Sequence, residues 1–188
     1  MRLRRIEEEF TGQVELSWRS FLLRPEPGRK RDLEKFRAYT KSWRRPAAEA
    51  DAGEFNEWST DAGPPSHSVP PHGFAKAAAR LGEDAFRRAH EALMRAYFRD
   101  NLDISDDATQ RALWQELELP AEGLAARDDP AILAEILAEH REALDRGATG
   151  VPAIRLEGND AVIVGAHPME LYRRWVTRTL ARSEAGEI

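Results

Sequence analysis

The residues of this sequence that could do chemistry are few, because its 188 residues include five histidines and no cysteine. Without cysteine, these residues offer no disulfide, no thiolate metal ligand and no thiol nucleophile. His67 and His72 lie in a proline-rich stretch, and histidine side chains exchange protons near neutral pH. Neither a third histidine nor an acidic residue at ligand spacing completes a metal site there. We therefore expect no metal site, and we expect both histidines to face solvent or to brace their loop.

Motifs that bind nucleotides or activate a serine are absent as well. The sequence contains no Gly-x-Gly-x-x-Gly, no Gly-x-x-x-x-Gly-Lys and no Gly-x-Ser-x-Gly pattern. Dinucleotide, phosphate-loop and serine-hydrolase chemistry therefore have no support, and we expect no cofactor. The most informative feature that is left is Gly150-Val151-Pro152, a proline step that leads into the short apolar run at residues 153–156.

Charge and hydropathy argue against nucleic acid as a partner and against a membrane-spanning segment. The formal net charge is −5 at pH 7 and the pI is about 5.6, which disfavours nucleic acid as a partner. No apolar run approaches the roughly 20 residues that cross a bilayer. Residues 1–10 lack the apolar stretch of a signal peptide, which favours the cytoplasm. The length suits one domain, or one domain that carries a large insertion.

Hydrophobic spacing predicts a helix and then a strand in the first part of the chain. Leu3, Ile6 and Phe10 recur every three or four residues, which indicates an amphipathic helix that Gly12 ends. Apolar and polar residues then alternate over about residues 14–23, which is typical of a half-buried strand.

Two stretches of different character follow this strand. Residues 29–45 are basic and predicted to be helical, with Trp43 either exposed or covering the insertion. Residues 46–73 are rich in Pro, Gly, Ser, Ala and Asp, but they also contain Phe55 and Trp58. A free linker would leave two large aromatic side chains exposed to water. We therefore expect an ordered loop that they anchor to the core.

Helices predominate from there up to Gly147. We expect one at residues 74–81 and a second that begins after Gly82. A third is expected to have Ser105 as its N-cap, and a fourth to begin at Pro130. The predicted inward face of the fourth helix consists of Ile132, Leu133, Ile136, Leu137 and Leu144.

The last part of the chain predicts a hairpin and a helix. Two short strands are expected at residues 153–156 and 161–164, joined by a turn at residues 157–160. Pro168 then opens the final helix. Without the block at residues 29–128, the order is helix, strand, helix, strand, strand, helix.

Several sequence blocks occur in an order and spacing that point to one family. They are Leu16-Ser17-Trp18-Arg19-Ser20-Phe21-Leu22-Leu23, Pro64-Pro65-Ser66-His67-Ser68 with residues 75–78, residues 85–89 with 96–98, Asp103-Ile104, and Gly147-Ala148-Thr149-Gly150-Val151-Pro152 with residues 164–168. Together they resemble the DsbA family, in particular its cytoplasmic branch of dithiol-disulfide isomerases and oxidoreductases. The resemblance implies an α/β, thioredoxin-like fold with a large all-helical insertion. Residues 1–28 and 129–188 would form the thioredoxin-like domain, and residues 29–128 the helical insertion domain.

The resemblance also implies a binding site. Val151-Pro152 corresponds to the cis-proline loop of the family, in which the backbone of Val151 can pair with an extended peptide. Gly150, Val151 and Pro152 are therefore the predicted substrate-binding residues. His72 is a weaker candidate, as a proton shuttle beside the groove. The implied partner is an extended peptide or a protein thiol or disulfide, with glutathione as a further candidate.

The sequence departs from the family at its beginning. Family members are similar in starting with a strand, followed by Cys-Pro-x-Cys at the first helix, and the resemblance implies that residue 1 of this sequence falls inside that helix. We expect an N-terminally truncated sequence, and a truly redox-inactive protein is the alternative. The first strand is central in such a sheet, and without it the strand at residues 14–23 would leave buried N–H and C=O groups unpaired.

Three functions stay open at this stage. The first is a thiol–disulfide oxidoreductase or isomerase by descent, whose nucleophile would lie upstream, so that no catalytic residue is expected within this chain. The second is a non-catalytic module that binds peptides or a partner protein. The third is a glutathione-dependent enzyme similar to 2-hydroxychromene-2-carboxylate isomerase, a branch that can use serine in place of cysteine. The substrate, the redox partner and the oligomeric state are not predicted.

Overall fold

The computed structural model describes residues 2–28, 32–49, 51–157 and 159–186. Its internal contacts divide the chain into two compact units. The terminal unit consists of Met1–Phe21 and Glu139–Ile188, and the central unit of Leu22–Ala138. This division is a grouping by contact, and the assignment of residues 29–128 as an insertion domain stays a prediction.

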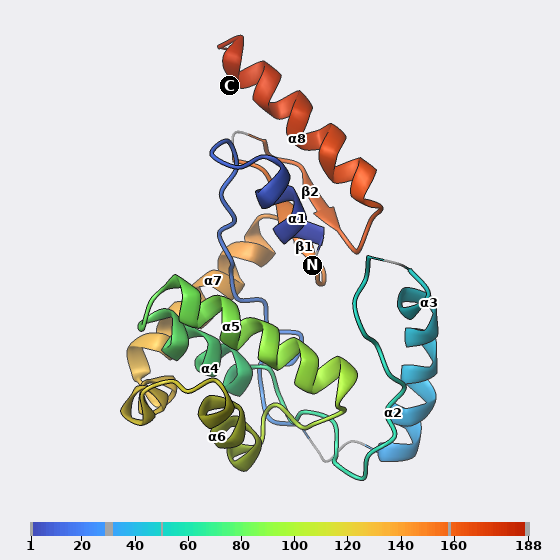
Figure 1. Ribbon diagram of the computed structural model, residues 1–188, viewed down its shortest axis with the longest axis vertical. Coiled ribbons are helices and arrows are strands. Elements are labelled where there is room, and N and C mark those ends of the chain that lie inside the picture. The colour runs from blue at the N-terminus through green and yellow to red at the C-terminus, as the bar shows by residue number, and fades with distance from the viewer. Residues whose placement is uncertain (1, 29–31, 50, 158, 187–188) are drawn as a thin grey trace. The chain divides into compact units, whose positions relative to one another are not determined.

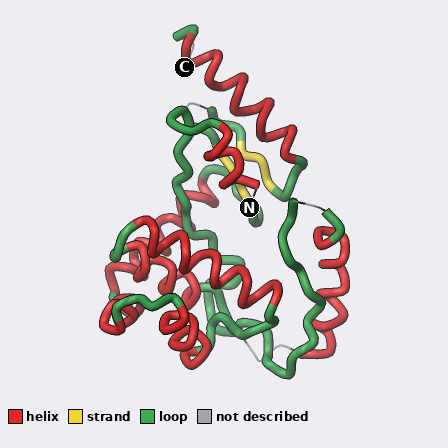
Figure 2. The backbone as a smooth tube through the Cα atoms, viewed as in Figure 1, coloured by secondary structure: helices red, strands yellow, loops and turns green. Residues whose placement is uncertain are grey.

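The central unit is helical (Figures 1 and 2). In chain order it contains α2 (Leu33–Thr40), the 3₁₀ turn η1 (Lys41–Trp43), α3 (Arg44–Ala47), α4 (Val69–Ala79), α5 (Glu83–Met94), the π-helical turn η2 (Arg95–Arg99), α6 (Asp107–Glu116), the 3₁₀ helix η3 (Ala121–Asp128) and the first part of α7 (Pro130–Asp145). The prediction of helix over residues 29–45 is therefore met from Leu33 onward, while residues 29–31 lie outside the described part of the chain.

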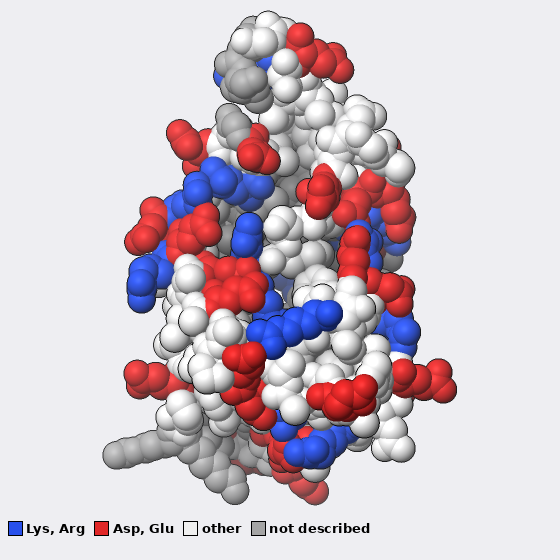
Figure 3. Space-filling view, turned by 90° about the vertical axis from the view of Figure 1, so that its left-hand side faces the viewer, with Lys and Arg blue, Asp and Glu red and all other residues white. Residues whose placement is uncertain are grey.

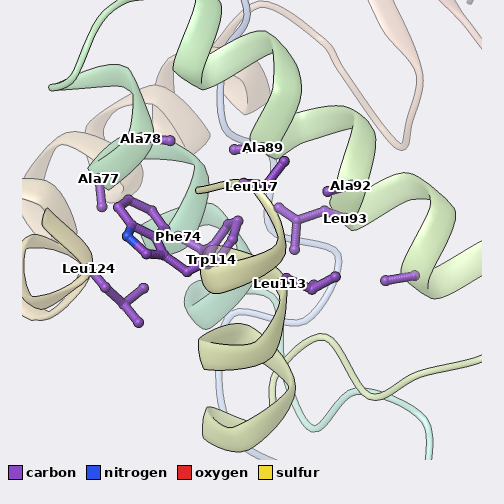
Figure 4. Close-up of a cluster of buried hydrophobic side chains, with 11 residues drawn as sticks. Phe74, Ala77, Ala78, Ala89, Ala92, Leu93, Leu113, Trp114, Leu117 and Leu124 are labelled. Atoms are coloured by element: carbon purple, nitrogen blue, oxygen red, sulfur yellow. The ribbon is translucent and has the colours of Figure 1, made fainter. Parts of the chain in front are cut away.

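Phe74 and Trp114 form the centre of the main core of this unit (Figure 4). Their rings meet edge to face with centroids 5.2 Å apart, a favourable arrangement for aromatic pairs. Small residues on α4 and α5 (Ala77, Ala78, Ala89 and Ala92) surround them and let the two helices approach closely. Burial of the two aromatic side chains removes a large apolar area from water, so this cluster holds α4, α5 and α6 together.

A second, aromatic cluster anchors the loop that follows α3. Trp58 is 3% exposed and its ring meets that of Phe36, while the ring of Phe55 meets that of Trp43 in the same cluster. The predicted anchoring by Phe55 and Trp58 is therefore confirmed. Trp43 is only 7% exposed and belongs to this cluster, so of its two expected placements the exposed one is wrong. The π-helical turn brings Tyr97 and Phe98 against the Trp43 ring, which encloses it.

Two helix starts differ from the prediction. Helix α4 begins at Val69 rather than at Phe74, because Pro70 and Pro71 fall in its first turn, where a missing N–H costs no hydrogen bond. The N-cap of α6 is Asp106 rather than Ser105, and its carboxylate accepts the backbone N–H of Thr109 at 2.9 Å.

The terminal unit contains α1 (Arg2–Glu9), β1 (Ala153–Arg155), β2 (Val162–Val164), the last part of α7 and α8 (Met169–Glu184). Within the described residues the sheet has two antiparallel strands, with Ile154 opposite Ile163. Ile6, Tyr172 and Val176 form the buried core of the unit, with Ile154 and Ile163 packed against them. The predicted hairpin and final helix are both present, and residue 158 of the predicted turn lies outside the described residues.

The predicted strand at residues 14–23 is not a strand in the structure. Burial does alternate along it, since Leu16 and Trp18 are half-buried while Glu15 and Ser17 are exposed. No strand among the described residues pairs with it, however, and carboxylates accept two of its N–H groups instead. The Glu7 carboxylate accepts the N–H of Leu16 at 3.1 Å. The alternation predicted an extended backbone correctly, but a strand also needs a hydrogen-bonded neighbour.

The predicted inward face of α7 is too wide. Ile132 and Ile136 are buried, but Leu133, Leu137 and Leu144 are 43%, 41% and 50% exposed. Only positions four residues apart on one side of the helix face the core. Apolar residues also occupy another side of α7, so hydrophobic spacing alone could not identify the inner face.

Candidate functional site

The predicted binding loop lies at the start of the hairpin. The Val151–Pro152 peptide bond is cis, and Pro152 directly precedes β1. The N–H of Gly165 donates to the carbonyl of Pro152 at 2.8 Å, which continues the β1–β2 ladder by one residue. The loop is therefore fixed to β2 on one side.

Val151 and Ala153 flank this proline. In an antiparallel ladder, backbone groups of successive residues point alternately toward and away from the neighbouring strand. Since Pro152 bonds toward β2, the N–H and C=O of Ala153 point toward the opposite edge of β1, and Val151 precedes the strand across the cis bond. Val151 is 50% exposed, and its backbone has no hydrogen-bond partner among the described residues. This edge can therefore accept an extended chain by strand addition.

Gly150 leaves space next to this edge. A Cβ atom added to Gly150 would meet no heavy atom within 4 Å outside its immediate chain neighbours, and its φ angle is not in the left-handed region. Neither local packing nor backbone conformation requires a glycine here. Gly150, Val151 and Pro152 thus form one accessible stretch of backbone.

Tyr172 and His167 support the loop from within the terminal unit. The sequence predicted Tyr172 only as part of the inner face of the last helix. Tyr172 is 3% exposed. Its hydroxyl accepts the backbone N–H of His167 at 3.0 Å and donates to the Gly165 carbonyl at 3.4 Å. The His167 Nε2 lies 3.1 Å from the Val164 carbonyl, which can only accept, so Nε2 carries the proton. Gly165 has φ +95°, and these bonds fix the turn that positions its N–H on Pro152. The Gly165-x-His167-Pro168 spacing is the sequence signal for this turn.

His72 belongs to the central unit, on α4. Its Nδ1 lies 2.9 Å from the carbonyl of Ser68, one turn earlier, so Nδ1 donates and the ring braces the first turn of the helix. The bracing role was one of the two roles expected for this residue. A role of His72 as a proton shuttle stays a prediction.

His67 ends a chain of hydrogen bonds in the central unit. Its Nδ1 lies 2.8 Å from the Ser66 hydroxyl, which lies 3.1 Å from the Ser105 hydroxyl, and Ser105 donates to Asp103 at 2.6 Å. Burial lowers the pKa of His67 below its usual value, and the negative charge of Asp103 opposes that shift. Burial therefore favours the neutral imidazole of His67. Each of the four side chains has a hydrogen-bond partner within this series.

Sites of other kinds find no support in the described part of the chain. No group of three or more His, Asp or Glu side chains there could hold a metal ion. None of the helices in the described ranges has the length and apolar character needed to cross a membrane. On the face drawn in Figure 3, basic and acidic side chains are interspersed, so that face has no extended positive field for nucleic acid.

Comparison with known proteins identifies related folds. A family model described as DSBA-like thioredoxin domain matches residues 1–176. One similar solved structure is that of a candidate protein disulfide isomerase from Nitrosomonas europaea, with TM-score 0.74, 16% identity, 97% of this chain and 89% of that chain covered. Another is the cytosolic disulfide reductase DsbM from Pseudomonas aeruginosa, with TM-score 0.66, 19% identity, and 98% and 89% of the two chains covered. No curated protein sequence matches. The expected α/β fold with a large helical part is confirmed.

Proposed function

Since the chain belongs to the family of DSBA-like thioredoxin domains, we propose that it holds an extended segment of a protein thiol or disulfide against the open edge of β1. One observation carries this proposal: the backbone of Val151 is exposed and unpartnered within the described residues, at the start of a strand whose other edge is occupied.

Backbone pairing would supply the affinity. A peptide that runs antiparallel to β1 would exchange N–H···O=C bonds with Val151 and Ala153, and the exposed Val151 side chain would add an apolar contact. Glutathione is a short peptide and could use the same edge. Such pairing tolerates many sequences, because it reads backbone rather than side chains.

The redox step needs a thiolate that attacks one sulfur of a disulfide, while the other sulfur leaves with the electron pair of the broken bond. The 188 residues contain no cysteine. We therefore assign the holding step to this chain, and an oxidoreductase or isomerase activity would require a thiolate from outside these residues. A non-catalytic binding module is the second candidate, favoured by the same composition. The proposal places this function in the cytoplasm, and the likeness to a cytosolic disulfide reductase supports that setting.

Amide mapping tests the proposal. A ¹⁵N-labelled chain is titrated with an extended peptide that carries serine at its cysteine position and, separately, with reduced glutathione. We expect the Val151 and Ala153 amide signals to shift. Val151→Asp removes the apolar contact at an exposed position and should weaken binding, whereas Leu144→Asp, an apolar-to-acidic change at an equally exposed residue of α7, should not. Shifts confined to other elements for both probes would refute the assignment.

A second measurement separates holding from redox catalysis. Insulin reduction by the 188-residue chain should equal the background rate of the thiol reagent, because the chain supplies no thiolate. Catalysis above that background would contradict the division of roles proposed here.

A further inference from the structure

A second open backbone edge lies in the terminal unit, in the extended segment between α1 and the central unit. Along this segment the side chains of Leu16 and Trp18 are half-buried, and those of Glu15, Ser17 and Arg19 are exposed. The N–H groups of Leu16 and Ser20 point to one side, where the Glu7 and Glu139 carboxylates accept them at 3.1 and 2.8 Å. The N–H groups of Leu16 and Ser20 are thus bound by side chains of the same unit.

The backbone groups of the odd-numbered residues differ from those of Leu16 and Ser20. In an extended chain the N–H and C=O groups of Glu15, Ser17 and Arg19 point to the side opposite those of Leu16 and Ser20. The backbones of these three residues have no hydrogen-bond partner in the described part of the chain. A row of unpaired backbone groups on exposed residues is a template for pairing with another chain.

The charges along this edge are self-complementary. If two copies pair antiparallel about a two-fold axis at Ser17, Glu15 of each copy lies opposite Arg19 of the other. Opposite charges directly across a strand pair stabilise it, and like charges destabilise it. On the other face of the same register, Leu16 lies opposite Trp18 and provides two apolar cross-strand pairs.

Arg19 is able to take this second partner. Its guanidinium lies 3.3 Å from the Glu139 carboxylate, yet the side chain is 62% exposed. Glu15 makes no ion pair within the described residues. An interchain pair would use the exposed part of the Arg19 guanidinium, and the buried Glu139 carboxylate would keep the N–H of Ser20 as a partner.

From this geometry we propose that residues 15–19 are a homodimer interface, in which two copies join edge to edge as an antiparallel strand pair centred on Ser17. The three odd-numbered positions of each copy supply about six N–H···O=C bonds. The same patch on both copies closes a two-fold dimer. Such an interface is small, so the dimer is concentration-dependent rather than permanent.

Sedimentation velocity of the full chain over about 5–500 µM tests this, since association at micromolar strength is resolved in that range. The wild-type chain should pass from monomer to dimer. Glu15→Lys replaces two attractive pairs by two repulsive ones and should raise the dissociation constant at least about tenfold. Glu8→Lys changes the net charge equally at an exposed residue of α1 and should leave dimerisation unchanged.

Two further arms test the backbone pairing and the register. Ser17→Pro removes the central N–H and should abolish the dimer, while Ser17→Ala keeps the N–H and should not. Arg19→Glu should weaken self-association as Glu15→Lys does, but an equal mixture of the two variants should form a heterodimer with both charge pairs attractive. Circular dichroism checks that each variant is folded. If Arg19→Glu does not fold, the results for Glu15→Lys and Ser17→Pro are sufficient to test the dimer. A wild-type chain that stays monomeric, or a dimer that Glu15→Lys and Ser17→Pro affect no more than Glu8→Lys, overturns the proposal.

Discussion

The Glu139 carboxylate accepts the backbone N–H of Ser20 at 2.8 Å, across 119 residues of sequence. Glu139 is 5% exposed, and it also pairs with the exposed guanidinium of Arg19. One buried side chain on α7 thereby takes a backbone group that a neighbouring strand would otherwise bind. This contact holds the extended segment in the terminal unit, where no strand of the described residues lies beside it.

Replacement of Glu139 by leucine should therefore destabilise the protein more than loss of an ordinary ion pair. Glu139→Leu leaves the buried Ser20 N–H without an acceptor, at a cost of about 2–3 kcal/mol in the free energy of unfolding. Glu139→Gln keeps a carbonyl oxygen and should cost about 1 kcal/mol. Urea unfolding measures both.

The control for Glu139 is Glu142→Gln, one turn further along α7. Glu142 pairs with Arg146 at the surface, where such pairs contribute little, so this change should cost under about 0.5 kcal/mol. Equal losses for Glu139→Leu and Glu142→Gln would show that the Ser20 contact is not important for stability.

Gly73 and Gly150 should respond oppositely to substitution by alanine. A Cβ on Gly73 would lie 2.8 Å from the backbone oxygen of Arg127, so α4 and η3 would have to separate. We expect Gly73→Ala to cost about 1–3 kcal/mol, as overpacking does. Gly150→Ala meets no neighbour and should stay within about 0.5 kcal/mol of wild type. Thermal or urea unfolding distinguishes them, and a neutral Gly73→Ala would contradict the close approach of α4 to η3.

Asn101 should be sensitive for two separable reasons. It is 1% exposed with φ 55°, and its amide bonds the Ser59 N–H at 3.0 Å and the Asn56 carbonyl at 3.3 Å. Asn101→Gly keeps the backbone conformation but loses these bonds, at about 2 kcal/mol. Asn101→Ala loses the bonds and also strains the left-handed backbone, which adds about 1 kcal/mol. Urea unfolding followed by tryptophan fluorescence should give this order; a more stable Ala variant would refute it.

The His67 side chain should make stability depend on pH below neutrality. Burial lowers the pKa of His67 in the folded protein, whereas the unfolded chain keeps its ordinary pKa of about 6.5. Between the two values the unfolded chain binds more protons, so the free energy of unfolding falls as the pH drops through that window. His67→Gln does not titrate and should lose less stability between about pH 7.5 and 5.5 than wild type.

Asp103 provides the internal check on this dependence. Its negative charge raises the pKa of His67 against the effect of burial. Asp103→Asn should therefore widen the window and steepen the loss of stability in acid. Chemical unfolding at a series of pH values measures all three proteins, and a His67→Gln profile parallel to that of wild type would show that His67 does not contribute.

The sequence by itself determined the local elements, because their signals are short-range. The Gly82 break and the Pro130 start follow from backbone rules that act within a few residues. The anchoring of the 46–73 loop was also predictable, because burial of the large aromatic side chains of Trp58 and Phe55 is favourable. The three binding-loop residues were placed together by their adjacency in the chain.

Only the tertiary structure decided which partner each surface meets. Alternating burial over residues 14–23 predicted an extended chain, but the partners of Leu16 and Ser20 are carboxylates on helices, not a strand. Isoleucines and leucines on two sides of α7 look alike as apolar residues in the sequence, yet only Ile132 and Ile136 are buried. Backbone conformation is set by neighbouring residues, whereas pairing and burial are set by segments that folding brings together, as with Ser20 and Glu139, which are 119 residues apart.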